Sequence, residues 1–224
     1  MTSVLAGLLN ESAEWRLLGL LFEYPAGEWR QQVAALAGEA ADPLLREAAS
    51  VALAEATAGA HHSILGPGGP APAREASYHP GVQLGYLMAE ISSVYESFGY
   101  RPASPEPPDH VAVEAGFIAY LKLKQVYAEA SGRGDEASLC RQAVDYFTRE
   151  HLSVIAAPLA ERLEFAAPAW LALAGRALLE RAGPPEAAPA FHLPELDEDE
   201  LTCAAAPPAV SPLIQIPRPE NPHE

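Results

Sequence analysis

The chain has 224 residues, of which 49% are hydrophobic, and a formal net charge of −16. This length suits one domain with a sizeable core, or one domain with a tail, and the charge disfavours nucleic acid and anionic lipid as partners. No run of 18 apolar residues predicts a transmembrane helix, and the two cysteines, Cys140 and Cys203, lie in no pattern that predicts a zinc site, an iron–sulfur site or a disulfide framework.

The compartment is inferred from the start of the chain and from the cysteines. Residues 1–5 lack the basic segment, the apolar segment and the cleavage site of a secretory leader, and acidic side chains follow at Glu11 and Glu14. Two cysteines far apart in the sequence suit a reducing environment. We therefore expect a cytoplasmic protein without stable membrane insertion.

Apolar residues recur at three- and four-residue spacing over residues 11–181, and no alternating pattern indicates a strand, so we predict an all-α fold. Asp42, which precedes a proline, predicts an N-cap, Asp135 predicts another, and Gly99 predicts a helix end. Pro158 falls within or between two later helices. The other expected helices cover residues 11–22, 28–38, 43–58, 83–98, 110–130, 135–151 and 168–181.

Two histidines and a segment of glycine and proline follow the third predicted helix. His61 and His62 would point about 100° apart on a helix and lack a His-Glu-x-x-His pattern, which favours a surface pair at a helix end over a metal site. Residues 66–72 exclude a helix and lack the lysine and hydroxyl of a phosphate-binding loop. We expect a long ordered loop or a hinge between two helical lobes over residues 66–80.

The most informative segment is Pro105-Glu106-Pro107-Pro108-Asp109-His110, which leads directly into an apolar-faced helix. The prolines fix the backbone, so we expect Asp109 to cap that helix with its carboxylate and His110 to lie in the first turn, at the surface. No serine or cysteine nucleophile stands nearby, which disfavours catalysis. The segment is therefore either a helix cap with a surface histidine or a place where a peptide binds beside an apolar surface.

Aromatic residues at helical spacing form a stripe on both sides of this segment. Such a stripe is more often part of a core than of a groove, although a subset at a groove edge could receive an apolar helix. The stripe consists of Tyr86, Tyr95, Phe98, Phe117, Tyr120 and Tyr127.

The final residues, 184–224, differ in composition from the rest: ten are proline, eight are acidic and one is basic. Such a segment buries too little apolar surface to offset the entropy of the chain. We expect a largely irregular acidic tail, in which Glu195–Glu200 is solvated or competes with a basic peptide. The tail would dock, if at all, through Leu213, Ile214 and Ile216.

Several of these segments resemble the TorD/DmsD/NarJ family of chaperones for molybdopterin enzymes. Residues 106–110 match a Glu-Pro-x-Asp-His signature, residues 61–69 resemble an aromatic-x-x-Leu-Phe-Gly-Pro-Gly segment, and residues 74–78 resemble the Glu-Ser-x-Tyr that follows it. Residues 142–152 resemble a later segment that ends in His-Leu. The resemblance covers about residues 11–183 and is most similar to the branch that serves dimethylsulfide, ethylbenzene, selenate or chlorate enzymes.

The resemblance implies a helical chaperone domain over residues 1–183, as a monomer or a domain-swapped dimer, without cofactor or catalysis. Its partners would be the twin-arginine leader and the body of a molybdopterin oxidoreductase catalytic subunit, which it would hold until the cofactor is inserted. Leu65 stands where the family often has phenylalanine. This departure bears on which partner the protein binds and leaves the expected class of protein, a chaperone, unchanged. The peptide-binding residues that we expect are Ile64, Leu65, Tyr78, Glu106, Pro107, Asp109, His110 and Glu114.

Two other functions stay open. The chain could be a permanent structural subunit of a redox complex, or a small helical enzyme or nucleotide-binding regulator that uses His110, Asp109 and the glycine loop. The second has little support, because the sequence offers no phosphate cradle, metal set or nucleophile. A permanent subunit would remain with the purified mature enzyme, whereas a chaperone would be absent from it.

Overall fold

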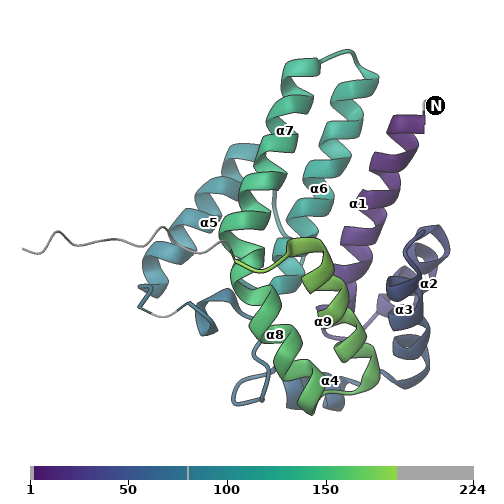
Figure 1. Cartoon of the computed structure of the whole chain (residues 1–224), viewed down its shortest axis with the longest axis vertical. Coiled ribbons are helices and arrows are strands. Elements are labelled where there is room, and N and C mark those ends of the chain that lie inside the picture. The colour runs from purple at the N-terminus through teal and green to yellow at the C-terminus, as the bar shows by residue number, and fades with distance from the viewer. Residues whose placement is uncertain (1–2, 80, 186–224) are drawn as a thin grey trace, which may run out of the picture. The chain divides into compact units, whose positions relative to one another are not determined.

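A computed structural model describes residues 3–79 and 81–185, and these residues form helices and loops without a named strand (Figure 1). The predicted all-α fold is confirmed. The acidic block Glu195–Glu200 and the predicted docking residues Leu213, Ile214 and Ile216 lie outside the described residues. The helices are α1 (Ser3–Phe22), α2 (Trp29–Glu39), α3 (Pro43–Glu55), α4 (Ala58–Leu65), α5 (Leu84–Phe98), α6 (Val111–Ala130), α7 (Gly134–Phe147), α8 (Ser153–Ala166) and α9 (Ala169–Ala182), with a 3₁₀ turn η1 (Glu75–Ser77) and a π-helical turn η2 (Thr148–Leu152).

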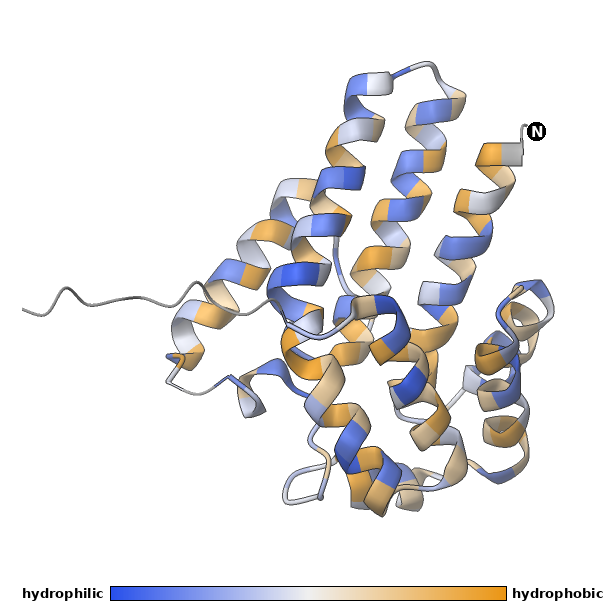
Figure 2. Ribbon diagram, in the orientation of Figure 1, coloured by the Kyte–Doolittle hydropathy of each residue, from blue (hydrophilic) through white to orange (hydrophobic). Residues whose placement is uncertain are grey.

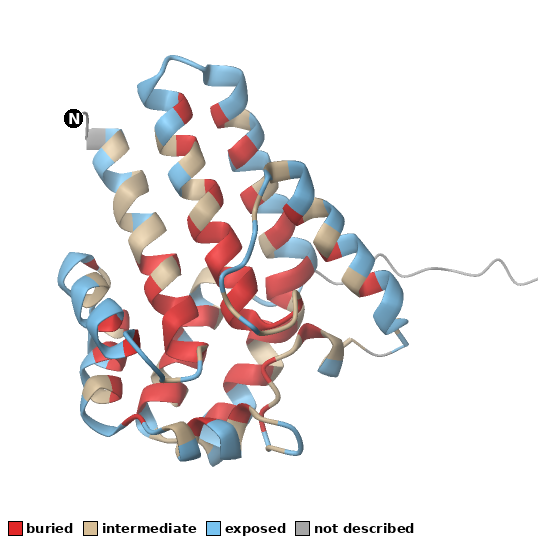
Figure 3. Ribbon diagram, turned by 180° about the vertical axis from the view of Figure 1, so that it is seen from behind, coloured by how far each residue is buried: buried red, intermediate tan, exposed pale blue. Residues whose placement is uncertain are grey.

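The core is built around the antiparallel pair of α1 and α6. The second half of α1 and the first half of α6 are largely apolar in Figure 2 and buried in Figure 3, and α7 packs along the other side of α6. Helices α2 and α3 pack on α1, and α9 packs on α3 and α8. This arrangement places the start of α6, which follows the proline-rich segment, next to the end of α1.

Two of the predicted helix ends are confirmed. The carboxylate of Asp42 accepts hydrogen bonds from the backbone N–H groups of Leu44 and Leu45, as an N-cap does. Gly99 ends α5 in the left-handed conformation with a φ of 70°, which a residue without a side chain adopts at low cost. Where the helical domain ends, and whether residues 66–80 act as a hinge, stay predictions.

Other local predictions need correction. The helix predicted over residues 43–58 ends at Glu55, three residues earlier, and α4, which no predicted helix covers, follows it. Thr57 caps α4 by accepting from the N–H of Ala60. The prediction that Asp135 caps α7 is wrong: Arg133 holds the cap position without a side-chain bond, and Asp135 lies in the first turn. An acid there still interacts favourably with the helix dipole.

The close approach of α1 and α6 depends on Gly19. A Cβ at this position would lie 3.0 Å from the carbonyl oxygen of Ala112 and 3.6 Å from the Cβ of Ala115, whereas a Cβ at Gly7, in the same helix, would meet nothing within 4 Å. We predict that Gly19→Val lowers the free energy of unfolding by about 1–3 kcal/mol through overpacking. Gly7→Val should change it by less than about 0.5 kcal/mol, since it touches nothing. Chemical denaturation of both variants checks this, and equal stability of the two would contradict the packing described.

Candidate functional site

Two segments that are far apart in the sequence pair with each other at the start of α6. The backbone N–H of Glu75 donates to the carbonyl of Asp109 at 2.9 Å, and the N–H of Val111 donates to the carbonyl of Ala73 at 2.9 Å. The result is an antiparallel bridge between Arg74 and His110. It fixes the loop that follows α4 against the proline-rich segment that follows α5.

An ion pair between the partly exposed Arg74 and the buried Asp109 reinforces this bridge. The Nε of Arg74 donates to Oδ1 of Asp109 at 2.8 Å, Nη2 lies 2.7 Å from the same oxygen, and the backbone N–H of Ala76 donates to Oδ2 at 3.3 Å. The Asp109 side chain is fully buried. The prediction that Asp109 caps α6 is therefore wrong, because its carboxylate turns toward the neighbouring loop.

His110 occupies the N-cap position in place of Asp109. Its Nδ1 accepts a hydrogen bond from the backbone N–H of Ala112 at 3.2 Å. The residue is only 5% exposed, so the prediction that it lies at the surface is also wrong. Burial, with the nearby charges of His61 and Arg74, lowers the pKa of His110 to about 3. The imidazole is thus neutral at physiological pH, with its proton on Nε2.

His61 is a second buried imidazole beside it, and its prediction as part of a surface pair needs the same correction. Its Nε2 lies 3.0 Å from the carbonyl oxygen of Phe22, and its ring packs against those of Tyr24 and Trp170, at centroid distances of 5.5 and 6.5 Å. Burial lowers the pKa of His61, against the opposing effects of the Phe22 carbonyl and of the Glu106 charge. His62, one position along, is exposed.

A cavity of about 510 Å³ opens where these segments meet. It gathers the end of α4, the glycine loop, the paired segment and the proline-rich segment. Of the residues predicted to bind a peptide, Leu65, Glu106, Pro107 and His110 line it. The other lining residues are Tyr24, His61, His62, Gly66, Pro67, Gly68, Pro72, Arg74 and Ser77.

The glycine loop that forms one wall is tightly folded. The N–H of Ala71 donates to the carbonyl of Ile64 at 3.1 Å, and the N–H of Gly69 donates to the carbonyl of Gly66 at 2.9 Å. A side chain at Gly69 would collide with the carbonyl of Ile64, and one at Gly66 would collide with that of His62. Glycine is needed at both positions because the backbone passes so close to the end of α4.

Four of the predicted peptide-binding residues do not line the cavity. Asp109 and Glu114 are fully buried, Ile64 packs partly buried against the core, and Tyr78 is half-buried with the guanidinium of Arg162 5.1 Å from its ring centroid. Burial raises the pKa of Tyr78 to about 12. Asp109 and Glu114 therefore have no exposed side chain for a partner, whereas the binding roles of Ile64 and Tyr78, which are partly exposed, stay predictions.

Buried acids lie beneath the bridge. Oε2 of Glu75 is 3.0 Å from Nδ1 of His151, which lies in η2, while both side-chain oxygens of Glu114 have no hydrogen-bond partner among the described residues. Burial, followed by the charges of Glu75 and Asp109, raises the pKa of Glu114 well above its usual range. The protonated, neutral form of Glu114 is therefore favoured over the charged form. The hydroxyl of Tyr95 donates to the carbonyl of Pro108 at 2.9 Å and so holds the proline-rich segment over this cluster.

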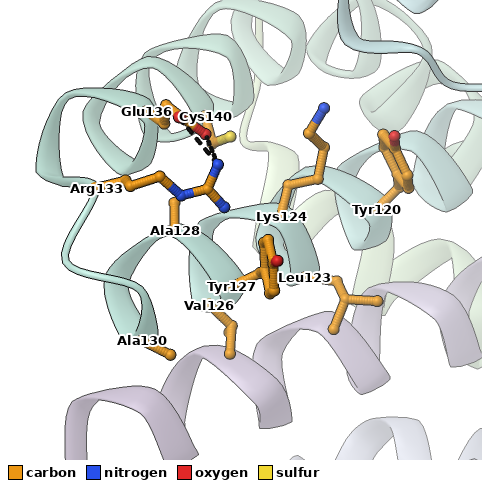
Figure 4. A pocket seen from close by; sticks show the side chains of 10 residues that line it. All are labelled: Tyr120, Leu123, Lys124, Val126, Tyr127, Ala128, Ala130, Arg133, Glu136 and Cys140. Atoms are coloured by element: carbon orange, nitrogen blue, oxygen red, sulfur yellow. Dashed lines mark hydrogen bonds and ion pairs between the residues drawn. The ribbon is translucent and has the colours of Figure 1, made fainter.

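A second cavity, of about 660 Å³, is lined by residues of α6 and α7 and of the turn between them (Figure 4), and none of the predicted binding residues lines it. Leu123, Tyr127 and Cys140 line it, and its two cations are engaged: Arg133 pairs with Glu136, and Lys124 donates to the carbonyl of Phe98. The six residues of the predicted aromatic stripe differ in burial. Tyr95 and Phe117 are core residues, Phe98 and Tyr120 pack partly buried on the core, and Tyr86 and Tyr127 are exposed.

Sequence reasoning missed three residues that organise the site: Arg74, Glu75 and His61. Arg74 and Glu75 lie within a segment noted only for its resemblance, and nothing in the neighbouring sequence indicates that they pair with distant residues. Within the described part of the chain, no group of three or more His, Cys, Asp or Glu side chains is arranged to hold a metal ion. No described helix is long and apolar enough to cross a membrane.

Comparison with known proteins supplies the family. Residues 27–161 match the model of the nitrate reductase delta subunit family, which includes the NarJ and TorD types of chaperone. The chain belongs to this family. Its members are chaperones that act in the maturation of redox enzymes, as the resemblance of the motifs implied. The match covers more than half of the chain and includes both segments of the bridge.

The fold has a counterpart among solved structures. The crystal structure of a candidate redox enzyme maturation protein from Archaeoglobus fulgidus superposes with a TM-score of 0.51 and 18% sequence identity, covering 76% of this chain and 92% of that one. A likeness at this identity supports the fold alone. A search among curated protein sequences returns no match.

The ion pair should contribute to stability. We predict that Asp109→Ala lowers the free energy of unfolding by about 1–3 kcal/mol, because the N–H of Ala76 loses its acceptor and Arg74, which is 36% exposed and can be hydrated, loses its partner. Glu136→Ala removes an exposed pair with Arg133 and should cost less than about 1 kcal/mol. Denaturation with urea measures both changes, and equal losses of stability in the two variants would contradict a larger contribution from the pair of Arg74 and Asp109.

The buried Glu114 should make stability depend on pH. Its pKa is raised in the folded state, so its contribution is complete below pH 4.5, the usual value, and is lost as the pH rises toward the folded-state pKa. Loss of stability over that interval reaches about 1.4 kcal/mol per pH unit. We predict that Glu114→Gln, a neutral replacement of similar shape, is more stable than the wild type at pH 8 and has a flatter profile. Denaturation of both proteins at pH 5 and pH 8 is the measurement, and parallel profiles would contradict it.

Proposed function

We propose that this chaperone binds the twin-arginine leader of a molybdopterin oxidoreductase catalytic subunit in the 510 Å³ cavity. It would act in the cytoplasm, hold the subunit while the cofactor is inserted, and release it for export without catalysing a reaction. The observation that carries the proposal is the convergence of the two segments that resemble the family, residues 61–69 and 106–110, on one cavity.

The chemistry of the cavity suits a basic peptide with an apolar portion. Leu65, Pro67 and Pro107 offer apolar wall, and Glu106 places a carboxylate at the same opening. A guanidinium that meets a carboxylate forms a charge-assisted hydrogen bond, and the net charge of −16 attracts a cationic chain from a distance. Apolar contact would supply affinity, and charge would supply the rate of encounter.

The descriptive name of the family gives a second candidate, a permanent subunit of a redox complex. The two functions differ in what remains bound at the end of maturation. Purification of the mature oxidoreductase decides between them, because a chaperone is absent from the active enzyme and a subunit is retained in fixed proportion.

Glu106 provides the test of leader binding. We predict that Glu106→Gln weakens binding of a synthetic leader with two consecutive arginines by about threefold to tenfold, the worth of one charge-assisted contact. Binding by the wild type should also weaken more steeply with salt than binding by the variant. Titration calorimetry at two salt concentrations measures both effects.

The matched control is Glu150→Gln, which removes an acid that is 47% exposed and lies outside the cavity. It should bind the leader within twofold of the wild type. If both variants lose the same affinity, net charge alone attracts the peptide and Glu106 has no specific contact.

A further inference from the structure

His61 and His110 are more than neighbours in the wall of the cavity. Each is 5% exposed, and each has one ring nitrogen that is used inside the protein: Nδ1 of His110 accepts from Ala112, and Nε2 of His61 bonds to the carbonyl of Phe22. The other nitrogen of each ring has no hydrogen-bond partner among the described residues. Neither of these nitrogens is among the polar atoms that are sealed from solvent without a partner.

The internal bonds decide what each free nitrogen can do. A carbonyl oxygen can only accept, so Nε2 of His61 carries the proton and its Nδ1 is left as an acceptor. A backbone N–H can only donate, so Nδ1 of His110 is the bare nitrogen and its Nε2 carries the proton. The two histidines that line the cavity therefore have, between them, one free neutral acceptor and one free neutral donor.

Both rings stay neutral at physiological pH, because burial lowers both pKa values and the proximity of His61 lowers that of His110 further. A pair of this kind does not select for charge. It matches a neutral group that offers one N–H and one C=O on the same side, and a residue in extended conformation offers these from its own main chain, as in antiparallel strand pairing.

Building on the proposed function, we infer that His61 and His110 together bind the main chain of one extended residue of the partner, whose N–H donates to Nδ1 of His61 and whose C=O accepts from Nε2 of His110. The contact specifies conformation and register rather than side chain. Glu106 would then read a basic side chain of the same segment, and His61 becomes a specificity-determining residue that the sequence did not indicate.

The test uses two variants that keep each internal bond and remove the outward group. In His61→Gln the side-chain amide still reaches Phe22 as a donor, but the acceptor at Nδ1 is lost. In His110→Asn the side-chain oxygen still caps α6, because asparagine is a favoured N-cap residue, but the donor at Nε2 is lost. His79→Gln, outside the cavity, is the control for an unrelated histidine.

The probe is a synthetic twin-arginine leader and a series of the same peptide in which one backbone N–H at a time is methylated. We expect each cavity variant to bind the leader about threefold to tenfold more weakly than the wild type, and His79→Gln to bind it equally. Methylation of one particular backbone N–H should weaken the binding of the peptide to the wild type by a similar factor. The same methylation should weaken its binding to His61→Gln by less than twofold. Thermal melting of each variant checks that it is folded, and the two variants are independent tests of the pair.

The outcomes separate the inference from the proposed function. If the wild type binds no leader, the proposed function fails and the inference fails with it. If the leader binds but both variants bind as tightly as the wild type, or every methylated peptide loses as much with His61→Gln as with the wild type, only the main-chain contact is overturned. A third outcome is that removing one Asn or Gln side chain from the peptide weakens binding, whereas methylation of the backbone has no effect. The two histidines would then bind a side-chain amide, and the main-chain contact would be overturned in the same way.

Discussion

The contact between Arg74 and Asp109 holds the site together. The two residues come from separate loops, and their ion pair, with the backbone bridge beside it, decides where the proline-rich segment lies relative to the glycine loop. A buried carboxylate without this partner would be costly, so the pairing is specific. The pairing of Arg74 with Asp109 places the adjacent His110 in the cavity wall and fixes the start of α6 against α1.

The polar groups around this contact are buried at a cost that a purely structural core would avoid. Burial disfavours charge in these surroundings, so it raises the pKa of Glu114 and lowers the pKa values of His61 and His110. Neutral imidazoles keep hydrogen-bonding capacity without attracting ions. This gives the cavity directional contacts for a peptide, while the wider acidic surface supplies attraction over distance.

The helices and the motif could be predicted because they depend on neighbours in the sequence: apolar periodicity gives the helices, and Asp42 caps the residues that follow it. The role of Asp109 could not be predicted in this way. Its local sequence favours a helix cap, but its carboxylate pairs instead with Arg74, which lies 35 residues earlier in the chain. His61 looked like a surface residue because its partners, Phe22 and Trp170, are far away in the chain. Local patterns thus found the residues of the site but assigned several of them the wrong environment.

Hydrogen–deuterium exchange of the full chain, with and without a synthetic twin-arginine leader, reports most directly on where the partner binds. Slower exchange should appear at the backbone amides of residues 61–77 and 104–112, which surround the cavity beside the Arg74–Asp109 pair. Protection confined instead to residues 120–140, around the cavity between α6 and α7, would place the binding surface elsewhere and contradict the site described here.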